Sequence, residues 1–557
     1  LAGERCPGRT VGLVDAVDAA GNGLAVGVTD FWQRYPKGLT AADGALNLHL
    51  FPALEGPADP GDLPAHLSFP FVEGHYRFKW GMSTTDRFVL APHGAAGREA
   101  ATQAALEAVW PVVAVLPGSH YESTGALGEM TGDRALFPAW DERFAEAFEG
   151  HLQSKEANRE YGFFNWGDWY GERGTNWGNN EYDLPHGLFL QFARTGRRDY
   201  YRLALAGARH QADVDIVHAY PDPHYLGGNI LHSVAHTGEW SQDIKERQWS
   251  FPYSFHAAAY NGHTWASGLC DAWYLAADPR VMEAALALGE HIAWQMAPHF
   301  KELGTHERSA GWSGHAIAEL YRATADPVYL RALEQIVAVA YREQNFAENG
   351  AWPHLLPTDH AGGVPGARGN VAFLIGVLLA AIDDQYVLQP SEQATRSLTA
   401  ATAWLKTQWM PELGVFQYTS SPSYRASARP SQAVLNPLIL GPMLKVAELT
   451  GDQELLEIGA RGFAAATAHG FDRFGKSLSQ MAHFAPLIMA RLKRLGAPAK
   501  PYGADLTRNS EALRRAALLT AKPATRLNLR GPEDKLVLLR HRGGAGTVTV
   551  TREPWGA

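Results

Sequence analysis

The spacing of apolar residues changes twice along the chain. Over residues 11–90, short segments alternate apolar and polar positions between turns, as in ALNLHLFP and HYRFKWGM, which predicts a β-rich region. Over 98–110 and 141–157 the apolar residues recur with helical spacing, and we expect helix to dominate as far as residue 496. Near the end, KLVLLRHR and GTVTVTRE predict a closing β-hairpin around Gly543–Gly546.

A unit of two helices joined by a short turn recurs in the helical region. The turns are TGRRDYYRLAL, AADPRVMEAAL, TADPVYLRALE and TGDQELLEIGA, with the acids Asp199, Asp278, Asp326 and Asp452. We expect each Asp to cap its second helix, and two of these helices to begin with a proline, whose missing N–H costs nothing at that position. A hairpin repeat of this kind buries its apolar face only against its neighbours, so it must curve into a ring or a solenoid.

The unequal spacing of these turns favours the ring, because a solenoid keeps a nearly fixed period. The long aromatic and Gly-rich inserts between helices are then expected to gather at one mouth of the ring and form a site. The prediction is a mainly α protein with flanking β structure. It has a β-rich region at 1–95, an (α/α) toroid at 96–496 and a C-terminal β segment at 497–557.

The run from Tyr161 to His186, YGFFNWGDWYGERGTNWGNNEYDLPH, has neither helical nor strand periodicity. Its amide and carboxyl groups would need partners if buried, and aromatic rings beside planar amides suit the apolar faces and hydroxyls of sugars. We therefore interpret the run as the floor of a carbohydrate site; the alternative is a loop that only covers a core. The candidate substrate-binding residues in it are Asn165, Trp166, Trp169, Arg173, Asn179, Asn180 and Tyr182.

Histidines and tyrosines are dense between His218 and His263. Histidine is the side chain most easily poised for proton transfer near neutral pH, although a single histidine is more often structural. The candidate catalytic residues are His232, His236, His256 and Tyr260, and further candidates for substrate binding are Asn261, His263, Arg308 and Trp312. Trp352, His354 and Tyr418 are interpreted either as walls of sugar subsites or as packing.

The composition of the chain limits the classes of protein and of partner that fit it. The 557 residues are 46% hydrophobic and 19% charged, which suits a well-packed protein of two or three domains. The net charge of -9 and the lack of a Lys/Arg cluster argue against nucleic acid as a partner. The longest apolar run, VAFLIGVLLAAI at 371–382, is too short to cross a bilayer, so no membrane partner is expected and a buried helix is predicted there.

Cys6 and Cys270 are the only cysteines, which leaves no disulfide framework and no thiolate metal site. HSVAH places His232 and His236 four residues apart, but the Glu of a zinc protease motif is missing and no third ligand is evident. We therefore expect no cofactor and no catalytic metal, and leave open a structural or assisting divalent cation. The sequence has neither an initiator Met nor a signal-peptide pattern at Leu1, so we expect a processed or trimmed product. The compartment is not readable from the sequence, with secretion or the periplasm slightly favoured over the cytoplasm.

Four blocks carry a family resemblance: FWQRYPKGL at 31–39, the following LNLHLFP, NWGDWYGE, and GHTWASGLCDAWYLAADPR at 262–280. Together they resemble the exo-rhamnogalacturonan lyase family of polysaccharide lyases and its uncharacterised bacterial relatives, over about residues 31–496. The resemblance implies an (α/α) toroid between β structures, an N-terminal portion absent from this chain, and an acidic polysaccharide substrate with a rhamnogalacturonan-like backbone. The resemblance does not assign the family's catalytic residues to individual positions of this chain.

Cleavage of a 4-linked uronic acid by β-elimination sets three tasks: neutralising the C6 carboxylate, removing the C5 proton and protonating the leaving oxygen. Arg173 or the amides Asn179 and Asn180 are candidates for the first task, and the histidines for the second. Tyr260 is a candidate for the acid or, with its pKa lowered by a nearby cation, for the base. The long inserts at 165–183 and 221–253 predict an exo-acting enzyme, because they have enough mass to close a cleft into a pocket.

Two alternatives remain open at this stage. A glycoside hydrolase on the same toroid would use a pair of carboxyl groups. Its candidate acids are Asp168, Glu172, Glu181, Asp183, Glu239 and Asp243. A sugar-binding module without catalysis would keep the aromatic walls and need no acid and base.

Overall fold

A computed structural model describes the following residues of the chain. They are 9–42, 45–53, 76, 78–79, 81–109, 111–171, 176–232, 236, 261–299, 307–356, 360–361, 364–420, 422–471, 475–496, 537–541 and 548–552.

The N-terminal region is β-rich, as its alternating pattern predicts. Strands β1 (Leu13–Val17), β2 (Gly23–Val28) and β5 (Phe88–His93) form an antiparallel sheet in the order β1-β2-β5, and β3 (Gly38–Ala42) pairs with β4 (Ala45–His49). Helix α2 (Arg98–Val109) lies on this sheet, so the first predicted helix packs with the strands. The contact is close at Gly27, where an added Cβ would lie 1.8 Å from the Ala105 carbonyl oxygen.

The segment HYRFKWGM is predicted as a strand, but its described residues Tyr76, Phe78, Lys79, Gly81 and Met82 lie outside any strand. The reason is packing. Tyr76 and Phe78 gather with Phe51 around Phe163, at ring-centroid distances of 5.1–6.2 Å from Phe163. These contacts tie the N-terminal region to the toroid.

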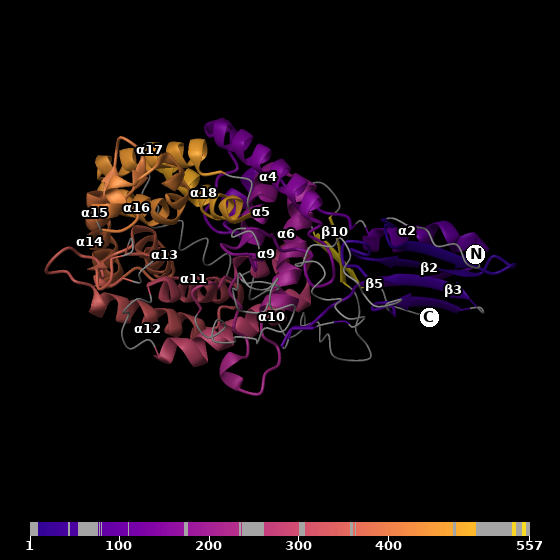
Figure 1. The fold of residues 1–557 in the computed structure, drawn as a ribbon. Coiled ribbons are helices and arrows are strands. Elements are labelled where there is room, and N and C mark those ends of the chain that lie inside the picture. The colour runs from indigo at the N-terminus through magenta and orange to yellow at the C-terminus, as the bar shows by residue number, and fades with distance from the viewer. Residues whose placement is uncertain are drawn as a thin grey trace.

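Twelve of the described helices form two concentric layers (Figure 1). The inner layer is α5 (Leu184–Thr195), α9 (Ser267–Ala276), α11 (Glu307–Thr324), α13 (Ala372–Leu388), α16 (Pro437–Thr450) and α18 (Gly475–Gly496). The outer layer is α4 (Pro138–Asn158), α6 (Arg198–His210), α10 (Pro279–Glu290), α12 (Pro327–Glu343), α14 (Glu392–Gln408) and α17 (Gln453–His469). Each inner helix packs on the next, and α18 returns to α5, which closes the ring.

The closed ring confirms the predicted (α/α) toroid. Its core is one continuous apolar cluster that runs through both layers. The apolar run at 371–382 lies in α13, which is buried along most of its length, as expected. Among the described residues, no helix is both long and apolar enough to span a membrane.

The two ends of the ring differ in their connections. Short turns follow the C-termini of the inner helices, whereas long segments at 159–183, 211–266, 344–371 and 409–436 precede their N-termini. The inserts therefore gather at one mouth, as predicted. Those at the mouth also carry the short pairs β6 (His354–Leu355) with β7 (Arg368–Gly369) and β8 (Trp409–Met410) with β9 (Val415–Phe416), and α15 (Pro422–Ala426).

Three of the four predicted caps are confirmed. Asp278, Asp326 and Asp452 each accept a hydrogen bond from a backbone N–H in the first turn of α10, α12 and α17. Asp199 is the exception, because α6 begins at Arg198 and places Asp199 inside the helix. From there its carboxylate accepts the N–H of the next residue, Tyr200, at 3.0 Å and pairs with Arg197. Near the C-terminus, β10 (Val537–His541) and β11 (Val548–Arg552) pair as the predicted hairpin.

Candidate functional site

Five side chains meet where the inner helices begin. Glu181 precedes α5, His263 precedes α9, Arg308 is the second residue of α11, and Lys476 is the second residue of α18; His232 comes from the long segment between α6 and α9. We call these five residues the mouth cluster. Its members come from four elements far apart in the sequence, brought together by closure of the ring.

The Glu181 carboxylate is the centre of the mouth cluster and is fully buried. Arg308 Nη2 lies 2.8 Å from its Oε1, and Lys476 Nζ lies 3.0 Å from its Oε2. His263 Nε2 is 3.2 Å from the same Oε1, and the His232 ring centroid is 4.7 Å from that of His263. Burial alone would raise the pKa of Glu181, but Lys476 and the two histidines outweigh it and hold that pKa well below its usual range.

His263 is held neutral. Burial, and after it the Arg308 guanidinium, lower the pKa of His263 well below its usual value, against the opposing charge of Glu181. Arg308 Nη2 donates to His263 Nε2 at 2.8 Å, and the buried Nδ1 has no hydrogen-bond partner within the described parts of the chain. A neutral imidazole beside a cation has the form that a general base requires.

The backbone before α5 is strained. Asn179, Asn180, Tyr182 and Asp183 all have φ between 47° and 67°, the left-handed region. Asn and Asp tolerate this region better than Tyr does, and such conformations cost energy that the surrounding contacts must supply. The result is that Glu181 faces the mouth while Asp183 caps α5 through the His186 N–H.

Tyr182 and Trp312 form an aromatic layer beneath the mouth cluster. The Tyr182 ring lies 5.8 Å from Lys476 Nζ and 6.0 Å from the Arg308 guanidinium carbon. Its centroid is 5.8 Å from that of Trp312, which in turn contacts Trp265 at 5.9 Å. These predicted binding residues are buried, so they support the cluster from below.

His236 lies apart from the mouth cluster, in a fully buried site. Its Nδ1 and Nε2 lie 3.0 and 3.1 Å from the Oδ1 atoms of Asn179 and Asn165. Both amides are fixed in this orientation, because Asn179 Nδ2 donates to the carbonyls of Ile230 and Leu231 and Asn165 Nδ2 donates to that of Tyr161.

With amide oxygens facing both ring nitrogens, this geometry fits a hydrogen on each nitrogen of His236. Its ring stacks on Trp177, with centroids 4.8 Å apart, and Asp168 Oδ2 lies 3.7 Å from Nδ1 as a counter-charge. In this state His236 has no lone pair for removing a proton, and it serves to hold the run in place.

The remaining candidates have structural contacts. Trp169 is fully buried, and an added Cβ at Gly178 or Gly475 would overlap its ring. Trp166 is half-buried and stacks on Tyr161, at a centroid distance of 5.5 Å. Asn180 donates to the Gly207 carbonyl, and Asn261 donates to His291. Arg173, His256 and Tyr260 lie outside the described residues.

Of the acids proposed for a hydrolase, three are described, and each is already engaged. Asp168 accepts the N–H groups of Asn179 and Asn180, at 2.7 and 2.8 Å. Asp183 accepts those of His186 and Gly268, and Glu181 is ion-paired. Glu172, Glu239 and Asp243 lie outside the described residues.

Two groups of side chains within the described residues have the ligand types of a metal site: Asp168 with His210 and His236, and Glu181 with His232 and His263. In each group at least one member is already engaged by other side chains. His236 faces amide oxygens at both ring nitrogens, and Glu181 is already neutralised by Arg308 and Lys476.

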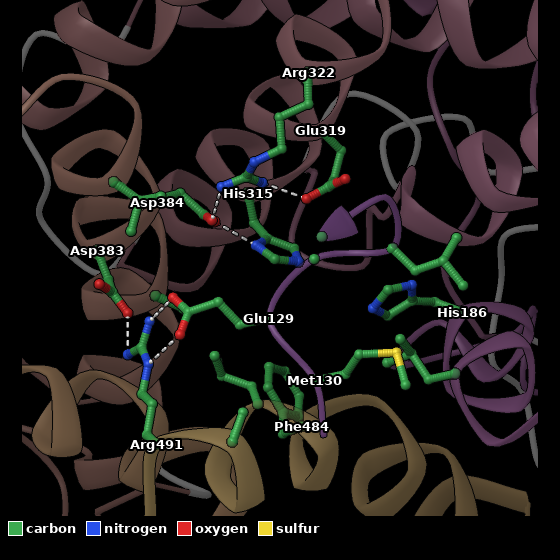
Figure 2. A pocket seen from close by; sticks show the side chains of 18 of the residues that line it. Glu129, Met130, His186, His315, Glu319, Arg322, Asp383, Asp384, Phe484 and Arg491 are labelled. Atoms are coloured by element: carbon green, nitrogen blue, oxygen red, sulfur yellow. Dashed lines mark hydrogen bonds and ion pairs between the residues drawn. The ribbon is translucent and has the colours of Figure 1, made fainter. Parts of the chain in front are cut away.

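A cavity of about 450 Å³ lies among the inner helices, toward the short-turn end of the ring, and Figure 2 shows it from close by. We call it the axial cavity. Its lining includes Glu122, Glu129, Met130, His186, Leu190, His315, Glu319, Arg322, Asp383, Asp384, His483, Phe484, Leu487, Arg491, Lys493 and Arg494. Sequence reasoning named His186 only as the end of the aromatic run and did not propose any of these residues as a binding residue, because most of them occupy ordinary helix positions.

Comparisons with known proteins agree with the fold. The family model described as the PcRGLX-like protein C-terminal alpha/alpha toroid domain matches residues 111–252. An uncharacterized protein of Bacillus subtilis (strain 168), YetA, is 26% identical over 242 residues, covering 39% of this chain and 28% of that protein. The match therefore spans less than a third of this relative.

Solved structures resemble the chain at low identity. A polysaccharide lyase is 12% identical, with a TM-score of 0.43 over 65% of this chain and 99% of its own. The cellobiose 2-epimerase of Bacillus thermoamylovorans B4167 is 10% identical, with a TM-score of 0.41 over 63% and 98%. The cellobiose 2-epimerase of Spirochaeta thermophila DSM 6192 is 12% identical, with a TM-score of 0.36 over 62% and 88%.

Proposed function

We propose that this chain is a polysaccharide lyase that cleaves a uronic-acid glycan by β-elimination, with the mouth cluster as its active site. The observation that carries the proposal is a neutral imidazole, His263, placed between a buried carboxylate and two cations at the open end of the toroid.

The charge of the mouth cluster favours an acidic substrate. Arg308 and Lys476 bring two positive charges against the single negative charge of Glu181, and both side chains remain partly exposed, at 16% and 25%. The N-termini of α5, α9, α11 and α18 open toward the same mouth and add the positive ends of their dipoles. A guanidinium is also the better bidentate partner for a carboxylate such as C6 of a uronic acid.

The proposed reaction assigns each step to a side chain. Arg308 turns to the substrate carboxylate, which frees the lone pair of His263 Nε2. His263 Nε2 then removes the C5 proton while Nδ1 keeps its hydrogen, and Glu181 stabilises the imidazolium that forms. The C4–oxygen bond breaks as the C4=C5 double bond forms, and the leaving oxygen takes a proton from His232, the neighbouring imidazole.

The engaged state of the described acids weighs against the hydrolase alternative. A hydrolase needs one carboxylic acid that can give its proton and one carboxylate that can act as base or nucleophile. Asp168 and Asp183 are committed to backbone N–H groups, and Glu181 to two cations.

We further propose exo-action on a rhamnogalacturonan-like backbone. The gathering of the long segments at one mouth supports a closed pocket, and the resemblance of the sequence to exo-rhamnogalacturonan lyases, together with the matching toroid model, supports the substrate.

The test is a panel of uronic-acid polysaccharides, with neutral polysaccharides as controls, followed by ultraviolet absorbance and product size. The proposal expects small products carrying a conjugated double bond, formed from acidic glycans only. New reducing ends without ultraviolet absorbance would establish hydrolysis instead, and a fast loss of viscosity before small products accumulate would contradict exo-action.

A further inference from the structure

We propose that the axial cavity is a second carbohydrate site, which binds a neutral mono- or disaccharide. This inference is independent of the reaction at the mouth. It rests on the separation of the cavity from the mouth cluster, on the pairing of its charges, and on the hydrogen-bonding state of three histidines.

The aromatic layer separates the two sites. Tyr182 contacts Lys476 and Arg308 with its ring, while its backbone carbonyl accepts a hydrogen bond from His483 Nδ1 at 3.1 Å, on the cavity side. Trp312 likewise contacts His483 at 6.2 Å and His315 at 6.1 Å. A ligand in the axial cavity therefore does not reach the mouth cluster.

The charges of the axial cavity are paired within its wall. Arg491 binds Asp383 and Glu129, and Arg322 binds Glu319 and Asp384. Lys493 binds Glu122, and Arg494 binds Glu129. Because each cation already has a carboxylate, the cavity offers no uncompensated charge to an ionic ligand, while its charged groups can still bind hydroxyls.

Three histidines from α5, α11 and α18 meet at the cavity. His186 Nδ1 and His315 Nδ1 each lie 2.6 Å from a carboxylate, of Asp271 and Asp384 respectively. Although burial opposes it, the Asp partner raises the pKa of His186 to about 9 and also raises that of His315.

His483 is the opposite case. Burial, followed by the charges of His186 and His315, lowers its pKa well below the usual value. With Nδ1–H donated to the Tyr182 carbonyl, its Nε2 is an acceptor. The ring centroids of His186 and His315 lie 4.7 and 5.4 Å from that of His483. Together the three rings offer two hydrogen-bond donors and one acceptor. One of these donors, His315 Nε2, is buried and has no hydrogen-bond partner in the described chain.

Apolar side chains lie beside these polar groups. Met130 and Phe484 line the cavity (Figure 2), and the Phe484 ring centroid is 4.2 Å from that of His483. An aromatic face beside donors and acceptors without net charge matches a neutral sugar, which has an apolar C–H face and several hydroxyls. The volume of about 450 Å³ lies in the range of small-molecule sites.

The test is calorimetric titration of the full chain with D-galactose, cellobiose and, as the charged comparison, D-galacturonate. Hydrogen exchange at 122–130 and 484–494 locates the binding. We expect a neutral sugar to bind and to slow exchange in both segments. Phe484→Leu and His315→Gln should each weaken that binding about three- to tenfold while leaving cleavage at the mouth unchanged.

Lys476→Met is the matched control at the mouth and should leave neutral-sugar binding unchanged. The inference is overturned if neither neutral sugar binds the folded wild-type protein, or if binding is lost in Lys476→Met and kept in the two cavity variants. If circular dichroism shows that a variant does not fold, the hydrogen-exchange result on the wild type decides in its place. Unchanged exchange in both segments on addition of the neutral sugars also overturns the inference.

Discussion

The two ends of the inner ring use charged residues in opposite ways. At the long-loop end, one buried carboxylate, Glu181, pairs with two partly exposed cations, Arg308 and Lys476, so these three described groups together carry one net positive charge. At the axial cavity each cation has a carboxylate of its own, as Arg491 has Asp383. The same toroid can thus present a site for an acidic ligand at one end and a site for a neutral ligand on its axis.

Loop length explains why the two sites differ. The long segments before the inner helices supply Glu181, His232 and His263 from irregular backbone, where side chains need not follow a helical period. The axial cavity is built from helix positions such as His315 and His483, whose spacing is fixed by packing. Catalysis is expected where the backbone can be shaped freely and where net charge remains.

The largest effect expected is the loss of the proposed base. His263→Gln should lower kcat by about two to four orders of magnitude, because no other described group at the mouth is a neutral imidazole beside Arg308. The matched cavity variant, His483→Gln, should leave kcat within about twofold. Steady-state assays of ultraviolet-absorbing product measure kcat of both variants. Equal losses of kcat would show that the mouth histidine has no special part in the reaction.

The next effect concerns substrate charge. Lys476→Met removes one of two cations and should raise KM for an acidic glycan about tenfold or more, since a charge-assisted contact is lost. Lys476→Arg should restore most of the affinity. If Lys476→Met changed kcat alone, Lys476 would act on the reaction and not on binding, and the charge comparison between the two ends would need revision.

The pH dependence gives a smaller and more specific test. Arg308 lowers the pKa of His263, so Arg308→Met should raise it. Because the base must be neutral to accept a proton, a higher pKa moves the acidic limb of the kcat/KM profile to higher pH. Profiles of wild type and Arg308→Met measure the shift, and a limb that moves to lower pH would show that His263 is not the titrating base.

The smallest effect lies in the short turns. Asp326→Ala should lower the free energy of unfolding by about 1 kcal/mol, because it removes the cap of α12. Asp199→Ala is the control, since Asp199 lies inside α6, and it should change stability by less than about 0.5 kcal/mol. Urea unfolding of both variants measures the difference, and an equal loss in both would mean that Asp199 also contributes as a cap.

The sequence predicts the toroid well because its signals are local. The turns before Asp278, Asp326 and Asp452 mark hairpins, and the lengths of the inserts place them at one end. The strand predicted at HYRFKWGM failed, because ring contacts to Phe163 decide the conformation there and no local period reports them.

The candidate site is less predictable, because its members meet only when the ring closes. The sequence pointed to His232, His263 and Arg308, which the structure brings together, and to His236, which the structure places in a separate buried site. Lys476 was missed because it is a single lysine near the start of a helix, with no aromatic or histidine neighbours in sequence to mark it. Only contacts between segments far apart in the chain show which residues form the candidate site.

The most direct test of the central claim is a crystal structure of His263→Gln soaked with an acidic oligosaccharide that the wild type cleaves. The account predicts a uronate whose C6 carboxylate lies within ion-pair distance of Arg308 and Lys476, with C5 facing position 263. A uronate found only in the axial cavity, with an empty mouth cluster, would contradict it.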